Sequence, residues 1–211
     1  IIKLGSPLFE VIDFYNKKFS KDKILKKYNL KNKNYFLISF HREENLLNDY
    51  KINEFIKIIN FVSKEGKYPV LLSVHPRLRN ILRKNIFKKK ILNNIQLMKP
   101  FNFSEYISLQ MGSKIVISDS GSLPEEASIL NFKSIILRDT FERQEIFEQT
   151  SSIISNLELN SFKKIFQIEL QNFDLNRRLK EYENFEFSKN LCKIIASKIP
   201  YINKYVWNKK S

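Results

Sequence analysis

The sequence has few cysteines and glycines, one and four respectively, and it has no long hydrophobic run among its 211 residues. One cysteine cannot form a disulfide within the chain, which favours a reducing compartment such as the cytoplasm. No apolar run approaches the roughly 20 residues that a membrane-spanning helix needs, so we expect no membrane segment. The first residue is Ile1 rather than Met, and the opening IIKLGSP lacks the basic and apolar regions of a signal peptide. We therefore expect a removed leader or a part of a longer chain.

The single cysteine, Cys192, has the apolar neighbours Leu191, Ile194 and Ile195. This spacing is typical of one face of a helix. We interpret Cys192 as a small hydrophobic residue on a buried helix face rather than as a nucleophile.

The charge is strongly basic, with 37 Lys and Arg against 22 Asp and Glu and a net charge of +15. The basic residues are scattered along expected helices, where they indicate solvated faces. No stripe of Lys and Arg interleaved with aromatic residues is present, as single-strand binders would show. We therefore expect no nucleic-acid partner, although a basic nucleic-acid-binding module stays an alternative.

Short apolar runs alternate with amphipathic stretches along most of the chain, the pattern of repeated strand–helix units. Runs such as VLLSV and IVISDS are apolar on both faces, as are central strands covered by helices on both sides. We predict an α/β fold, a Rossmann-like lobe with a parallel sheet of about five or six strands, over residues 1–199, and a tail over residues 200–211. The expected strands are Tyr35–Phe40, Pro69–Val74, Ile95–Met98, Ile115–Ser118, Ser134–Leu137 and Ser152–Ser155. The expected helices are Leu8–Phe19, Lys21–Tyr28 after an N-cap at Ser20, Ile52–Lys64, Arg77–Phe87, Ser104–Met111, Pro124–Leu130, Glu142–Gln149, Ser161–Leu170 and Ser188–Ile199.

Polar and charged residues gather where four of the expected strands end. HREEN occupies residues 41–45, HPR residues 75–77, DSGS residues 119–122 and RDT residues 138–140. Open parallel sheets bind ligands beyond the carboxyl ends of their strands, so these clusters share the expected binding edge. Both histidines of the chain, His41 and His75, lie there. We favour a functional role for the pair over the alternative that each caps a helix or bonds a backbone carbonyl.

The segment Ile115 to Glu126 carries the strongest single signal: a strand, a polar turn and a helix start. Gly121 stands where a turn needs a positive φ or a close approach. Ser118, Ser120 and Ser122 offer hydroxyl groups, and the helix start offers free N–H groups and the positive end of its dipole. We predict an anion site for phosphate here, although neither GxxxxGK[ST] nor GxGxxG is present.

The same turn has the pattern of a capping box, from Ser122 to Glu125, with Pro124 in the first turn of the helix. Glu126 lies about 100° further round the helix, where it is a candidate for holding ribose hydroxyl groups. Aromatic residues are candidates for stacking on a base, and they are Phe101, Phe103 and Tyr106.

In order, the motifs HREEN, VHPR, KPF with a following Tyr, SDSGSLPEEA and LRDTFERQE resemble the C-terminal domain of the non-hydrolysing UDP-N-acetylglucosamine 2-epimerases. The resemblance runs from Gly5-Ser6-Pro7 to the final helix. It implies the C-terminal half of a GT-B-like two-lobe enzyme, an isomerase that interconverts UDP-GlcNAc and UDP-ManNAc by eliminating and re-adding UDP. It also implies a place in cell-surface polysaccharide synthesis, with no metal and no cofactor.

The resemblance further implies a role for individual residues. His41 would be catalytic, close to the leaving diphosphate, Tyr106 would stack near uracil and Glu126 would hold the ribose. The residues that would bind UDP are Arg42, Tyr106, Ser120, Gly121, Ser122 and Glu126. The residues that would line the cleft are His75, Arg138, Glu142 and Arg143. The sequence departs from the usual motifs of the family at Glu43, Ser122, Phe141 and Gln144.

The resemblance leaves the substrate open. HREEN, HPR, LQM and ASILNF are similar to a capsule and O-antigen branch that acts on a UDP-N-acetyl-6-deoxy-L-hexosamine and gives UDP-N-acetyl-L-fucosamine. A GT-B glycosyltransferase donor domain is a further alternative. In the resembled family, the carboxylates that move the C2 proton lie in an N-terminal lobe, which we expect to be absent from this chain. We therefore expect this chain alone to bind UDP without epimerising it, and we expect a UDP-sugar, that lobe and a second copy in a homodimer as its partners.

Overall fold

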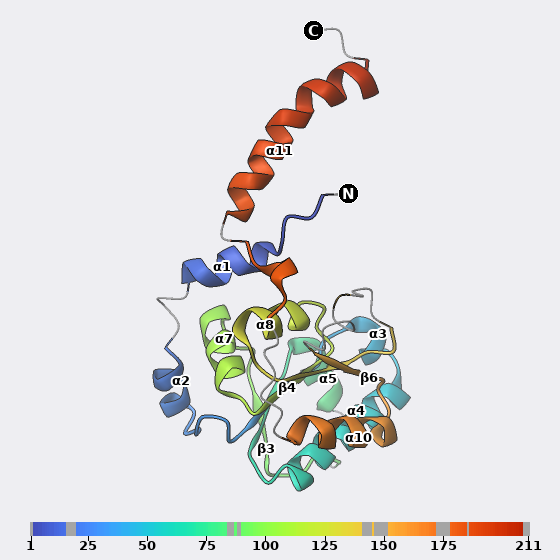
Figure 1. The fold of residues 1–211 in the computed structure, drawn as a ribbon. Coiled ribbons are helices and arrows are strands. Elements are labelled where there is room, and N and C mark those ends of the chain that lie inside the picture. Colours follow the sequence, from blue (N-terminus) through green and yellow to red (C-terminus); the bar gives the residue numbers. More distant parts are fainter. Residues whose placement is uncertain are drawn as a thin grey trace. The chain divides into compact units, whose positions relative to one another are not determined.

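The computed structural model describes residues 2–15, 20–83, 87, 90–140, 145, 152–171, 178–184 and 186–208. The chain divides into two compact units (Figure 1). The larger unit is Lys18–Arg178, and the smaller unit combines the two end segments Ile1–Lys17 and Leu179–Ser211.

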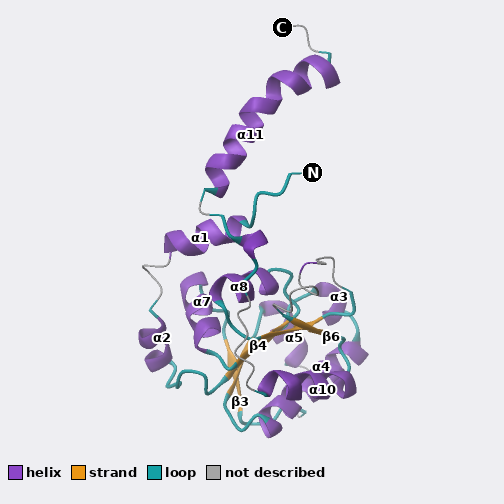
Figure 2. Cartoon of the chain, viewed as in Figure 1, coloured by secondary structure: helices purple, strands orange, loops and turns teal. Residues whose placement is uncertain are grey.

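The larger unit is built on a six-stranded parallel sheet with the strand order β3-β2-β1-β4-β5-β6. Figure 2 shows the strands in orange among the purple helices. All six expected strands are confirmed to within one residue at each end, as is the α/β fold class. The order places β1 and β4 side by side, at the point where the chain switches from one half of the sheet to the other. The strands are β1 Phe36–Ser39, β2 Val70–Ser73, β3 Ile95–Met98, β4 Ile115–Ser118, β5 Ser134–Leu137 and β6 Ile153–Ser155.

Helices cover both faces of this sheet. Phe36 and Ile38 of β1 pack in the main apolar cluster with residues of α4, α5 and α10, whereas Leu37 packs on the other face with residues of α2 and α7. Val116 of β4 faces α8 on that second side. Strands that are apolar on both faces are thereby buried on both faces, as the sequence predicted. The helices are α2 Lys21–Lys27, α3 Glu43–Leu46, α4 Asp49–Glu65, α5 Pro76–Leu82, α7 Phe103–Gly112, α8 Leu123–Leu130 and α10 Leu159–Leu170.

Helix ends are set by local polar contacts and close packing. The side chain of Asn48 accepts a hydrogen bond from the backbone N of Tyr50 at 2.9 Å, so α4 begins three residues before the predicted start. Gly66 ends α4, as predicted, with an ordinary negative φ of −71°. A Cβ atom on Gly66 would lie 2.2 Å from Cε2 of Phe36 and 2.6 Å from the carbonyl oxygen of Val62, so close approach requires the glycine.

Three neighbouring strands carry a serine at the same level. Ser39 at the end of β1 pairs in register with Ser73 of β2 and with Ser118 of β4. The Oγ atom of Ser39 donates a hydrogen bond of 2.7 Å to the Oγ atom of Ser118. The apolar interior of the sheet therefore ends at this level, and the polar binding edge begins.

The smaller unit corrects one sequence-based prediction. No side chain of its long helix α11 is buried, and Cys192 is exposed, so the prediction of a buried helix face was wrong. Leu191, Ile195 and Ile199 of the same face are 36%, 50% and 51% exposed. The apolar residues do share one face of the helix, but a periodic pattern does not show whether another surface covers that face. The elements of this unit are α1 Pro7–Tyr15, η2 Lys180–Tyr182, α11 Phe187–Tyr201 and the π-helix η3 Ile202–Val206.

Contacts between the two end segments hold the smaller unit together. The backbone N of Ser6 donates to the carbonyl oxygen of Tyr182 at 3.2 Å, and the backbone N of Ser188 donates to Oε2 of Glu10 at 3.0 Å. Helix α11 continues through Pro200 to Tyr201 and η3 follows, so the stretch that we predicted as a tail is helical up to residue 206. Over the ranges that the structure describes, none of the helices is long and apolar enough to cross a membrane.

Candidate functional site

The site is organised by Asp119, which directly follows β4 and is fully buried. Its carboxylate accepts hydrogen bonds from the backbone N atoms of His41 at 3.1 Å and Arg42 at 2.9 Å, and from Nδ2 of Asn45 at 3.2 Å. It also lies 3.2 Å from Nδ1 of His41. One carboxylate at the end of β4 thus fixes the whole loop that follows β1. The sequence placed Asp119 at the binding edge but gave it no role.

These contacts shift the pKa of both partners. Burial alone would raise the pKa of Asp119, but the hydrogen bonds from His41, Arg42 and Asn45 outweigh it and hold the pKa below its ordinary value. The hydrogen bond to Asp119 raises the pKa of His41, against the opposing effect of burial. Because Nδ1 is held by Asp119, Nε2 is the nitrogen of His41 that a ligand can contact.

Two guanidinium groups converge on the turn before α8. A Cβ atom on Gly121 would lie 3.2 Å from Nη2 of Arg42 and 4.0 Å from Nη1 of Arg138. Arg42 is fixed there because its Nε donates to the carbonyl oxygen of Asp119 at 2.8 Å. Gly5 is the glycine of the chain with a positive φ, so close approach to Arg42, rather than backbone conformation, explains Gly121. Two positively charged side chains therefore flank the turn, an arrangement that favours the binding of an anion.

The hydroxyl groups of the turn point to one another and to Glu126. The Oγ atoms of Ser120 and Ser122 are 3.0 Å apart, and the backbone N of Ser120 donates to Oγ of Ser118 at 3.1 Å. Ser122 is the N-cap residue of α8, but its side chain makes no capping hydrogen bond, so the predicted capping box was wrong. The Oγ atom of Ser122 donates instead to Oε1 of Glu126 at 2.8 Å, because Ser122 has a helical backbone conformation that points its side chain along the helix.

Glu126 has a second partner that the sequence did not predict. Nε2 of Gln110, a fully buried residue of α7, donates to Oε2 of Glu126. Burial raises the pKa of Glu126, and the hydrogen bonds from Gln110 and Ser122 partly oppose this rise. A buried amide in a neighbouring helix gives no pattern in the sequence, so only the three-dimensional contact reveals Gln110.

The remaining predicted residues lie at different places. The hydroxyl of Tyr106 is 2.9 Å from Oγ of Ser39, and its ring stacks on Phe101 with centroids 6.4 Å apart. Nδ1 of His75 accepts a hydrogen bond from the backbone N of Arg77 at 3.4 Å, which makes His75 the N-cap of α5.

The predicted residues Glu142 and Arg143, and most of the expected helix 142–149, lie outside the described residues. Within the described ranges, no group of three or more His, Cys, Asp or Glu is placed to hold a metal ion.

The arrangement suits a ligand that carries phosphate beside hydroxyl groups. Arg42, Arg138 and the start of α8 provide positive charge. His41 provides a ring whose Nε2 a ligand can contact, and Glu126 provides a carboxylate that is held by Ser122. All of them lie at the carboxyl edge of the sheet around the β1–β4 switch point, where open α/β sheets bind ligands. The parallel sheet and the polar site at its carboxyl edge define the class of protein: a Rossmann-like lobe of the GT-B-like kind.

Residues 1–196 match the UDP-N-acetylglucosamine 2-epimerase family, and the chain belongs to that family. It is 34% identical over 127 residues to the UDP-N-acetylglucosamine 2-epimerase of Methanococcus maripaludis, covering 59% of this chain and 35% of the relative. It is 32% identical over 122 residues to that of Methanocaldococcus jannaschii, covering 57% and 33%. The chain thus spans about a third of the length of these curated relatives.

Solved structures show the same fold over nearly the whole chain. The UDP-N-acetylglucosamine 2-epimerase of Rickettsia bellii superposes with a TM-score of 0.85 at 31% identity, covering 98% of this chain and 56% of that one. The Methanocaldococcus jannaschii enzyme in complex with UDP-GlcNAc and UDP gives a TM-score of 0.74 at 24% identity, covering 83% and 49%. The second likeness is one of fold alone.

Proposed function

We propose that this chain is the UDP-binding lobe, residues 1–199, of an enzyme that interconverts UDP-GlcNAc and UDP-ManNAc by eliminating and re-adding UDP. The convergence of Arg42 and Arg138 on the turn at Gly121, with the Asp119–His41 pair beside it, carries this proposal. Membership of the epimerase family supports it. So does the Methanocaldococcus jannaschii relative, whose structure holds UDP-GlcNAc and UDP.

The diphosphate would occupy the turn before α8. Arg42 presents Nη2 there, while its Nε donates to the carbonyl oxygen of Asp119 and so orients the side chain. The hydroxyl of Ser120 adds a neutral donor, and the start of α8 adds the positive end of a helix dipole. An anion at this position gains from both guanidinium groups and from the positive end of the helix dipole.

His41 would act on the leaving group. Breaking the bond between C1 and the diphosphate oxygen places negative charge on the phosphate, and a protonated imidazole beside it stabilises that charge. Asp119 favours the protonated form of His41 and orients its ring, since it binds Nδ1 and raises the pKa of the ring. Asp119 is therefore a positioning residue that acts through His41.

Glu126 would accept hydrogen bonds from the ribose. Gln110 and Ser122 hold one carboxylate oxygen each, which fixes the orientation of the group without neutralising it. Tyr106, whose hydroxyl contacts Ser39 at the same edge, would stack near uracil.

The proton chemistry at C2 would come from a further lobe. Among the described carboxylates near the site, Glu43 pairs with Arg77 at 3.2 Å and Glu44 pairs with Arg42 at 3.0 Å, and both are exposed. Because Glu43 and Glu44 pair with different arginines, they are not placed as an acid and a base on either side of one substrate carbon. We propose that an N-terminal lobe supplies them, that the intact protein works as a homodimer in the cytoplasm, and that it serves polysaccharide synthesis. A UDP-N-acetyl-6-deoxy-L-hexosamine is the alternative substrate.

Calorimetry with UDP tests the binding half of the proposal. Ser120→Ala and Glu126→Ala should each weaken UDP binding by about tenfold, the loss expected for one hydrogen bond to a charged group. Ser197→Ala, on the exposed helix α11, removes the same atom elsewhere and should change nothing. Absence of UDP affinity in the intact protein would contradict the proposal.

Incubation of the intact protein with UDP-GlcNAc in D₂O tests the reaction. Deuterium at C2 of the recovered UDP-sugar is the result expected of an epimerase. Transfer of the sugar to an acceptor without exchange at C2 would indicate a glycosyltransferase instead.

A further inference from the structure

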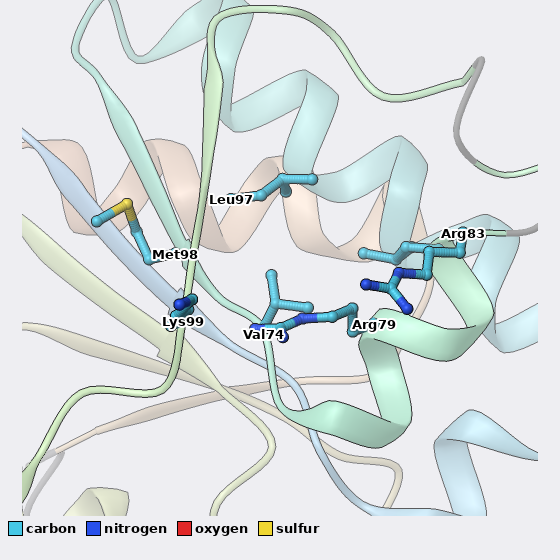
Figure 3. A pocket seen from close by; sticks show the side chains of 7 residues that line it. Val74, Arg79, Arg83, Leu97, Met98 and Lys99 are labelled. Carbon is cyan, nitrogen blue, oxygen red and sulfur yellow. The ribbon is translucent and has the colours of Figure 1, made fainter.

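A cavity of about 350 Å³ lies at the outer edge of the sheet, between α5 and the edge strand β3 (Figure 3). Its volume falls within the range of about 300–1,000 Å³ that is typical of small-molecule sites. None of the predicted site residues lines it. The lining residues are Val74, Arg79, Leu82, Arg83, Leu97, Met98 and Lys99.

The floor of this cavity is apolar. Val74 and Leu82 are buried side chains of the main apolar cluster, and Leu97 of β3 adds a side chain that is 53% exposed. An exposed leucine beside two buried aliphatic side chains leaves apolar surface in contact with water, which a ligand can cover with a gain in free energy.

The rim of the cavity is cationic. Figure 3 shows the side chains of Arg79, on α5, and of Arg83, directly after it, extending toward the segment that carries Leu97 and Lys99. In the part of the chain that the structure describes, none of these three cations takes part in an ion pair. The cavity therefore gathers three positive charges that no described carboxylate offsets.

The contrast with other basic residues of the unit is clear. Arg77, also on α5, pairs with Glu43 at 3.2 Å, and Lys51 pairs with Asp139 at 2.9 Å. The sequence explains the difference, because Gly66–Ser104 contains six Lys and three Arg, nine cations in all, and no Asp or Glu. A cavity built within this segment has no local carboxylate, so its lining offers a ligand cations and no competing acidic side chain.

We propose that this cavity binds an anionic amphiphile, whose apolar chain or ring covers Leu97 and Val74 and whose phosphate or carboxylate is held by Arg79, Arg83 and Lys99. A free phosphate gains nothing from the apolar floor, and a nucleic acid would find no aromatic side chain on which to stack. The amphiphile can come from a bilayer or from solution. Its site is separate from the turn at Gly121, so it does not rest on UDP binding.

Calorimetry of the full chain with octyl phosphate tests the site. Octyl phosphate should bind at least about tenfold more tightly than inorganic phosphate and than octyl glucoside, because only octyl phosphate satisfies both floor and rim. Arg79→Ala/Arg83→Ala should weaken its binding by at least about tenfold. Leu97→Ser, at an exposed position, should weaken the binding of octyl phosphate and leave the binding of inorganic phosphate unchanged.

A matched double variant separates a site from general charge. Lys23→Ala/Lys64→Ala removes the same charge from exposed positions elsewhere in the unit and should leave octyl phosphate binding unchanged. Equal losses in the two double variants, or equal affinity for octyl phosphate and inorganic phosphate, would overturn the proposal. So would displacement of octyl phosphate by UDP, which would assign the cavity to the nucleotide site. Thermal unfolding of each variant checks that the fold is retained.

Sedimentation with vesicles identifies the source of the ligand. Retention by phosphatidylglycerol vesicles but not by phosphatidylcholine vesicles, lost in Arg79→Ala/Arg83→Ala, would assign the site to an anionic lipid of a bilayer. Binding of octyl phosphate without retention by either vesicle would assign it to a soluble amphiphile. Retention that persists in the double variant would contradict a role of this cavity at the membrane.

Discussion

Nδ1 of His41 lies 3.2 Å from Oδ1 of Asp119, a carboxylate that is fully shielded from solvent. The same carboxylate accepts the backbone N–H groups of His41 and Arg42, so side chain and loop are fixed by one anchor. A histidine held in this way has a defined tautomer and a stabilised positive charge.

Replacement of the anchor should change the titration of the histidine. Asp119→Asn should lower the pKa of His41, because the hydrogen bond to the Asp119 carboxylate is the main cause of its rise. A two-dimensional NMR titration of both histidines, from about pH 5 to about pH 9, measures this directly. An unchanged pKa of His41 in Asp119→Asn would show that Asp119 does not control this pKa.

The raised pKa of His41 also makes stability depend on pH. The folded state binds the proton more tightly than the unfolded state, so the stabilisation is complete below the ordinary value of about 6.5 and is lost as pH rises through the raised pKa. The loss should stay below about 1 kcal/mol, because the side chain is 44% exposed and solvent screens the pair. Urea unfolding across this window, for the natural chain and for His41→Gln, should show the slope only in the former.

Recognition of ribose should depend on Glu126 and on its support by Gln110. The natural chain should prefer UDP to 2′-deoxy-UDP by about tenfold, and Glu126→Ala should abolish the preference while retaining diphosphate binding. Gln110→Ala should reduce the preference less, because Ser122 still holds one oxygen of Glu126 at 2.8 Å. Competition calorimetry with the two nucleotides measures the ratio, and an unchanged ratio in Glu126→Ala would contradict the assignment.

Alanine substitution should reduce stability at one glycine, Gly66, and UDP binding at another, Gly121. Gly66→Ala should reduce the free energy of unfolding by about 1–3 kcal/mol, because its Cβ would lie 2.2 Å from the buried ring of Phe36. This loss exceeds the roughly 0.4–1 kcal/mol gained from a stiffer unfolded chain. Gly121→Ala meets the flexible end of Arg42 at 3.2 Å and should change stability by less than about 0.5 kcal/mol while weakening UDP binding. Urea unfolding and UDP calorimetry on both variants should show this crossed pattern.

Two helix starts make a similar matched pair. Asn48→Ala should cost about 1 kcal/mol of stability, because the side chain accepts a hydrogen bond from the backbone N of Tyr50 at 2.9 Å. Ser20→Ala should cost almost nothing, since the Ser20 side chain makes no capping bond to α2. Equal reductions in the free energy of urea unfolding for the two variants would show that the residue type at the cap, rather than the hydrogen bond, sets the stability.

The strands of the larger unit were predictable because each is a short apolar run with polar residues at its end. The sheet edge followed from them, which placed His41, Gly121 and Arg138 together before any contact was known. Periodicity and strand ends are local properties, and both are fully written in the sequence.

Contacts of single side chains were less predictable. The pattern from Ser122 to Glu125 fits a capping box, yet the helical backbone at Ser122 directs its hydroxyl to Glu126. Gln110 lies sixteen positions before its partner in a different helix, and no spacing rule connects them. The prediction of a buried face at Cys192 was wrong for a related reason, since burial depends on what lies against a helix and not on its own residues alone.

The level row formed by Ser39, Ser73 and Ser118 makes the alignment of the strands a functional constraint. A slip of β1 by a single position would turn an apolar side chain toward the ligand and move His41 away from Asp119 by the length of one residue, about 3.3 Å. Insertions or deletions inside these strands should therefore disrupt the site even where the sheet still forms. Substitutions that merely shrink the core should lower its stability first and its activity only later.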